Sequence, residues 1–154
     1  MNYAIIEDGV AVNIVVCEKA EAKKAGFVVL PEGYRIGDKF DGLVWSKREL
    51  SPEEIIQVDN AIRAEIISKT QERLEAFAQS RGYDGVDSVA KYNGSKKPRY
   101  AADFRTISDA CSDTWEAVFA YQNDVITGQK PKPTGYADVE PHLPVLEWPT
   151  TTTP

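Results

Sequence analysis

The chain has 154 residues, and its formal net charge at pH 7 is −6. A protein of this length can bury one ordinary core, or two small cores that support each other. The acidic balance argues against a general nucleic-acid binder, which needs a positive field to release phosphate counterions. The two cysteines, Cys17 and Cys111, are too few and too far apart for a disulfide framework or a zinc module, so we expect buried free thiols.

The N-terminal sequence MNYAIIEDGV carries charges where a signal peptide would have an uninterrupted apolar run. The sequence also lacks a stretch that approaches the roughly 20 apolar residues of a membrane-spanning helix. We therefore expect a protein that is made in the cytoplasm and binds neither a membrane nor nucleic acid.

The first part of the chain, residues 1–48, has the pattern of a small antiparallel β module. Two apolar runs, 3–6 and 10–17, flank Asp8-Gly9, and an Asp-Gly pair supplies the positive φ angles of a tight hairpin turn. A short helical turn over 18–25, a third strand over 27–30 and a second hairpin around Asp41-Gly42 follow. So few strands bury little surface, so we expect this module to depend on the helices or on a partner chain for order.

Two long amphipathic helices are predicted in residues 49–128. Ser51-Pro52-Glu53-Glu54 combines an N-cap, a proline at the first helical position and a capping-box glutamate. The second helix runs from Pro98 to Gly128, where the glycine suits the left-handed residue after a helix. A short helix over 86–92, capped by Asp84 or Asp87, is expected between them. We expect an antiparallel helical hairpin whose two apolar stripes bury one another, with Trp115 at the centre.

Residues 129–154 form a proline-rich segment that we expect to be extended, apart from a short helical turn over 136–140. Its apolar anchors are predicted to bind a partner, as a docking arm does, and they are Leu143, Val145, Leu146 and Trp148. The alternative is a tail that folds back over the seam of the hairpin. The predicted fold class is therefore α+β, with an N-terminal antiparallel β module, an antiparallel helical hairpin and an extended C-terminal tail.

Residues with catalytic or metal-binding chemistry form no recognisable pattern in the sequence. His142 is the single histidine and has no partner at a suitable spacing. The basic residues of 96–99 suit a solvated loop, and the carboxylates of the helices suit solvated polar faces. We predict no catalytic residue, no cofactor and no metal ion.

Two stretches resemble proteins of tailed bacteriophages. YAIIEDGVAVNIVVCE followed by IGDKFDGLVWSK resembles the N-terminal β module of many small tail-region proteins, and residues 72–149 resemble a C-terminal module of proteins labelled tail fibre assembly or tail-associated. In that module a helix ends in Ala-x-x-(Arg)-Gly-Tyr-Asp. A short helix follows, then an alanine-rich helix containing Trp, a Gly-x-x-Pro-x-Pro-Thr turn and a closing Leu-Pro-x-Leu-x-Trp-Pro. The matching positions are Ala78, Arg81, Gly82, Tyr83, Asp84, Trp115, Gly128, Pro131, Pro133, Thr134, Leu143, Pro144, Leu146, Trp148 and Pro149.

This resemblance implies a non-enzymatic bacteriophage tail protein, made in the host cytoplasm and kept in the virion tail. Such a tail, baseplate or fibre-attachment subunit would bind larger tail proteins, and a homo-oligomer is compatible with that role. The alternative is a nonstructural tail fibre assembly chaperone, which holds a fibre or tail protein until it trimerises and then leaves. The two alternatives differ in whether the protein is retained in purified particles.

Overall fold

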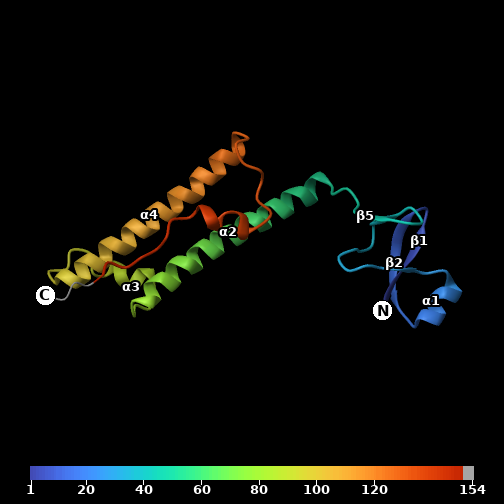
Figure 1. The fold of residues 1–154 in the computed structure, drawn as a ribbon, viewed down its shortest axis with the longest axis horizontal. Coiled ribbons are helices and arrows are strands. Elements are labelled where there is room, and N and C mark those ends of the chain that lie inside the picture. Colours follow the sequence, from blue (N-terminus) through green and yellow to red (C-terminus); the bar gives the residue numbers. More distant parts are fainter. Residues whose placement is uncertain (151–154) are drawn as a thin grey trace. The chain divides into compact units, whose positions relative to one another are not determined.

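The computed structural model describes residues 1–150, and the chain divides into two compact units, residues 1–55 and the residues from 56 onward. The first unit contains an antiparallel sheet, and the second contains long helices and a C-terminal tail (Figure 1). This is the predicted α+β class. The last four residues of the predicted tail, 151–154, lie outside the described part.

The sheet of the first unit has five short strands in the order β3-β1-β2-β4-β5. The strands are β1 (Asn2–Glu7), β2 (Val10–Val16), β3 (Val28–Val29), β4 (Lys39–Phe40) and β5 (Trp45–Ser46). Helix α1 (Lys19–Ala25) connects β2 to β3, and Gly26 ends it with a φ of +74°. All of the neighbouring strands are antiparallel.

Both predicted hairpins are present. Asp8 and Gly9 have φ angles of +48° and +77°, so both central turn residues adopt the left-handed conformation for which Asp-Gly is suited. The first hairpin pairs Tyr3 with Val15, and its register shifts between Ile5 and Ile6. The second hairpin pairs Phe40 with Trp45.

The first unit buries few large side chains. Its buried hydrophobic residues are Tyr3 and three alanines, Ala4, Ala11 and Ala22. Val12 and Val16 belong to the same strand as Ala11 but are 40% and 77% exposed. A core built largely from alanines contributes little hydrophobic free energy, because each one removes little apolar area from water.

Helix α2 (Pro52–Ser80) begins at the predicted capping box. The backbone N–H of Glu54 donates to Ser51 Oγ at 3.3 Å, and the N–H of Ser51 donates to the Glu54 carboxylate at 2.9 Å. The carboxylate of Glu54 also pairs with Arg48. These contacts satisfy backbone donors that the first turn of a helix leaves free.

Helix α4 (Pro98–Ile126) also has the predicted limits, because Pro98 occupies its first turn and Gly128 follows its end with a φ of +76°. Helix α3 (Val86–Ala90) precedes α4, but neither Asp84 nor Asp87 caps it. The N-cap position is Gly85, and the Glu75 side chain of α2 accepts the N–H of Val86 at 2.8 Å. The predicted cap was wrong because a long-range carboxylate satisfies this N–H in place of a local aspartate.

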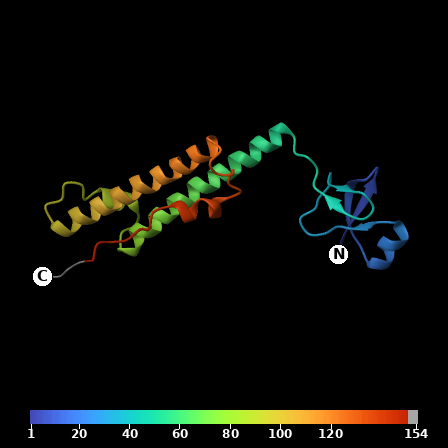
Figure 2. The ribbon, with the colours of Figure 1, turned by 45° about the horizontal axis from the view of Figure 1, so that its top comes forward.

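The tail of the second unit contains two 3-10 turns, η1 (Tyr136–Asp138) and η2 (Glu140–His142), and is extended from Leu143. It follows α2 in both views of the ribbon (Figures 1 and 2). Side chains of the tail belong to two hydrophobic clusters, each of which also contains residues of α2 and α4. The prediction that the stripes of α2 and α4 bury one another directly was therefore incomplete, because the tail supplies a third wall.

The second unit has two hydrophobic clusters. One contains Phe77 and Ala78 of α2, Val89 of α3 and Ile107 of α4, with Leu146 and Trp148 of the tail packed against them. The other contains Tyr121 of α4 with Val139 and Leu143 of the tail, and Ile66, Val118 and Val125 pack around these residues. Trp115 belongs to neither cluster and is half-buried, so its predicted place at the centre of the seam was wrong.

Candidate functional site

An apolar groove lies between α2 and α4, on the part of these helices that the extended tail does not reach. Its volume is about 730 Å³. Helix α2 contributes Ile62, Ile66 and Ile67, and a larger set of apolar side chains from α4 faces them, namely Trp115, Val118, Phe119, Tyr121, Val125 and Ile126. Lys132, Pro133 and Val139 of the tail complete the lining.

Three of the groove side chains are strongly exposed. Ile67 is 49% exposed, Phe119 is 62% exposed and Ile126 is 75% exposed. Scattered exposed hydrophobic residues are ordinary, but a continuous apolar hollow between two helices is typical of a surface that another molecule covers. The groove is therefore the candidate functional site.

The charged groups of the groove are Asp59, Arg63 and Lys132. Asp59 and Lys132 form an ion pair that joins α2 to the tail. Arg63 lies one helical turn after Asp59 and forms no ion pair within residues 1–150. A ligand of this groove would thus meet a mostly apolar lining and one cation, Arg63, that is not engaged in an ion pair.

The sequence did not predict the groove, because every large apolar residue of α4 was assigned to one buried stripe. One signal was available. Val118-Phe119 and Val125-Ile126 are adjacent apolar pairs, and neighbouring residues on a helix point about 100° apart. Such a stripe is too wide for one interface, so its outer members, Phe119 and Ile126, remain outside the core.

The four predicted partner-binding residues have different environments. Leu143 is buried against Tyr121, while Leu146 and Trp148 pack on the cluster around Phe77. Val145 alone of the four is exposed, at 79%. Partner binding by these residues stays a prediction, but three of them already serve the core of their own chain, which is the arrangement of the alternative, self-docked tail.

Trp148 is held by specific contacts. Its ring stacks on Phe77 with centroids 4.4 Å apart, and its indole N–H donates to the Phe77 carbonyl at 3.1 Å. Arg73 of α2 donates to the carbonyl of Pro144 at 2.6 Å, which fixes the same segment closer to η2. Both the ring and the N–H of Trp148 therefore have partners within the chain.

Residues of the phage-like motif converge near Trp148. The Arg81 guanidinium lies 5.5 Å from the Trp148 ring centre and pairs with Asp103 of α4 at 3.3 Å. Tyr83 donates to the same carboxylate at 2.7 Å, and burial and this hydrogen bond raise the pKa of Tyr83 to about 12. The motif residues Arg81, Tyr83 and Trp148 therefore share a structural role, which is to join the end of α2 and the tail to α4.

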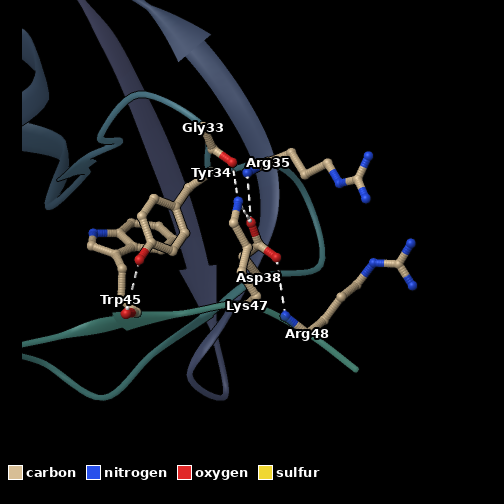
Figure 3. Close-up of polar contacts among 7 residues, drawn as sticks. All are labelled: Gly33, Tyr34, Arg35, Asp38, Trp45, Lys47 and Arg48. Atoms are coloured by element: carbon tan, nitrogen blue, oxygen red, sulfur yellow. Dashed lines mark hydrogen bonds and ion pairs between the residues drawn. The ribbon is translucent and has the colours of Figure 1, made fainter. Parts of the chain in front are cut away.

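In the first unit, the buried carboxylate of Asp38 is the centre of a polar network (Figure 3). It accepts the backbone N–H groups of Arg35 at 2.9 Å and Arg48 at 3.1 Å, and it pairs with the Lys47 ammonium at 3.0 Å. Burial alone would raise the pKa of Asp38. The three donors together have the larger, opposite effect, so the pKa is lowered to about 2. The donors lie before and after Asp38 in the sequence, so the carboxylate joins the loop before β4 to the segment that follows β5. We call this network the Asp38 clasp.

The remaining candidates do not gather into a reactive site. His142 is exposed beside Tyr121, and the free thiols of Cys17 and Cys111 are half-buried rather than buried. Within residues 1–150, no group of three or more His, Cys, Asp or Glu side chains is placed to hold a metal ion. Every helix in this part of the chain also falls short of the length or apolarity needed to cross a membrane.

Comparison of the chain with protein-family models, with curated proteins and with solved structures gave no match. The assignment of a function therefore rests on the groove and on the resemblance of the sequence to phage tail modules.

Proposed function

We propose that this chain is a non-enzymatic protein of a bacteriophage tail, a subunit of the tail, baseplate or fibre attachment that binds other proteins. The order and spacing of the motifs in residues 72–149 support the assignment to a phage tail. The groove between α2 and α4 supports the assignment to protein binding.

The observation that carries the proposal is the exposed apolar lining of the groove. Burying a side chain such as Phe119 or Ile126 in an interface stabilises a complex by roughly 1.5–3 kcal/mol each before ordering costs are subtracted. The floor is built on two long helices whose backbone hydrogen bonds are already made, so the surface exists before a partner arrives. A preformed apolar surface of this kind suits a subunit that assembles by docking.

The tail has a supporting role in this proposal. Because Leu143, Leu146 and Trp148 fasten it to α2 and α4, the tail forms one border of the groove. We therefore propose the groove, which the tail helps to shape, as the docking surface in place of the tail itself.

Quantitative mass spectrometry of purified phage particles tests the proposal. A virion component is expected in a constant number of copies per particle, in proportion to known tail subunits. A nonstructural assembly chaperone is expected in the lysate, bound to a fibre or tail protein, and absent from particles. Its absence from particles would replace the proposal by this alternative, and its absence from both fractions would remove both assignments.

A further inference from the structure

The walls of the groove restrict the kind of occupant that fits. Both walls are helices, so their backbone N–H and C=O groups are already used within α2 and α4. An extended peptide between them would depend on side chains for its backbone hydrogen bonds, as the tail depends on Arg73 at Pro144, and the lining of the groove is mostly apolar. A helix satisfies its backbone internally, and an apolar helical face would match the side chains of the groove.

The chain itself presents such a helical face. Ile56 of α2 is 58% exposed, and it lies on the same side of the helix as Arg63 and Ile67 of the groove, because seven and eleven residues complete about two and three helical turns. The same helix therefore provides both a wall of the groove and an uncovered apolar surface. This is the condition for an isologous interface, in which one patch is used by both partners.

Charge distribution along α2 also fits a second copy. If two α2 helices run antiparallel with a two-fold axis beside position 61, Asp59 of each copy faces Arg63 of the other. In the same register Ile56 of one copy faces Ile66 of the other, because both lie equally far from position 61. Asp59 pairs with Lys132 through Oδ2, so its Oδ1 is the acceptor offered to a second cation. Arg63, which forms no ion pair within residues 1–150 of its own chain, thus receives a carboxylate.

We infer that the groove is occupied by α2 of a second copy of this chain, which makes the protein a two-fold symmetric dimer. The inference rests on the proposed role of the groove as a protein-binding surface. The dimer would be the unit that joins larger tail proteins.

Sedimentation equilibrium of the full chain measures the dimer directly. The expected mass is twice that of the 17.1 kDa chain. Arg63→Glu places two carboxylates against each other at each of two symmetric positions. The dissociation constant of the dimer should therefore increase by about tenfold or more. Arg105→Glu is the matched control, because Arg105 is an exposed residue of α4 outside the groove. It makes the same charge change and should leave the dimer intact.

Charge complementation tests the register. The Asp59→Lys chain alone places its introduced ammonium group against Arg63 in both pairs, so it should dissociate as the Arg63→Glu chain does. An equimolar mixture of the two variants forms one native pair and one reversed pair. It should form a heterodimer that is tighter than the homodimer of either variant, although the Asp59→Lys chain also loses its own ion pair with Lys132. Thermal unfolding of each variant verifies that its monomer is folded.

A parent that is monomeric at concentrations up to about a millimolar would overturn the inference, as would an Arg63→Glu dimer as tight as that of the parent. A mixture that stays monomeric would reject the antiparallel α2 pairing. These outcomes are independent of the particle analysis. If the purified chain is monomeric in solution but is present in particles, the dimer alone is contradicted. If the purified chain is a dimer but is absent from particles, the virion assignment alone is contradicted.

Discussion

Asp38 shows how a single side chain can organise an irregular segment. Its backbone carbonyl accepts the N–H of Ala11 in β2, while its carboxylate holds the N–H groups of Arg35 and Arg48. Gly37 beside it has a φ of +93°, and a Cβ at that position would lie 2.9 Å from Arg48 Cδ. The sequence of residues 33–40, which contains Gly33 and Gly37, is typical of a loop. It did not predict that one aspartate would be buried in it, because its donors come from residues up to ten positions away.

The pKa of Asp38 gives a prediction with a definite sign. Its value of about 2 in the fold is lower than the ordinary value of 3.8, so the ionised carboxylate stabilises the folded state. This stabilisation is complete above the unfolded pKa and is lost as the pH falls from about 4 to about 2. The amide protons of Arg35 and Arg48 should report the titration in NMR spectra, with a midpoint near 2. A midpoint at or above 3.8 would contradict the clasp.

Asp38→Asn should destabilise the first unit by about 2–3 kcal/mol, since one carboxylate oxygen becomes an NH₂ group that faces donors. The control is Asp41→Asn, at an exposed turn of the same unit. Hydrogen exchange of the β1–β2 amides measures both variants. Equal protection of these amides from exchange in the two variants would show that the Asp38 network does not stabilise the first unit.

Two tryptophans show the limits of prediction at the level of single residues. Trp115 was expected at the centre of the helical seam and lines the groove, whereas Trp148 was expected on a docking arm and packs on Phe77. Periodicity identifies the apolar stripe of a helix, but it cannot say which part of the stripe another segment covers. In this chain the tail covers part of the stripe, through contacts between residues 71 positions apart in the sequence.

Element limits were predicted well because their signals are local. The capping box at Ser51, the proline at position 98 and the glycine after α4 act within one helical turn, and Asp8-Gly9 acts within one β-turn. The seating of the tail was left between two alternatives, since its proline pattern indicates an extended segment without indicating what it contacts. Which alternative holds depends on how α2 and α4 pack, and this packing is a property of the folded unit.

The tail should behave as a structural strap rather than a detachable arm. Leu143→Ala removes a buried side chain from the cluster around Tyr121 and should lower the free energy of unfolding by about 2–4 kcal/mol. Val145→Ala, two residues further on at an exposed position, should change it by no more than about 0.5 kcal/mol. Denaturant unfolding compares the two. A loss below about 0.5 kcal/mol for Leu143→Ala would restore the docking-arm hypothesis.

At the scale of the whole molecule, the chain contains two units with different kinds of stability. The first has a small alanine-rich core and the Asp38 clasp, and the second has two clusters of large side chains joined by the tail. Residues 1–48 were predicted as a separate module, and the compact unit extends to residue 55 because Arg48 and Ser51 bond to Glu54 in the first turn of α2. Hydrophobic patterning predicted the α+β class, with an N-terminal antiparallel β module followed by long helices. An open groove depends on which side chains remain uncovered, so patterning could not place it.

Incorporation of groove variants into phage particles tests the central claim most directly. Phe119→Ser with Ile126→Ser replaces two exposed groove residues, and Val145→Ser replaces an exposed apolar residue outside the groove. All three side chains are more than half exposed, so both chains should fold, which circular dichroism of the purified proteins verifies. If the groove is the assembly surface, mass spectrometry of particles should find the parental copy number for Val145→Ser. The double variant should be reduced by about tenfold or more, since two lost interface side chains cost roughly 1.5–3 kcal/mol each. Parental copy numbers for a folded double variant would contradict the claim that this chain acts through the groove.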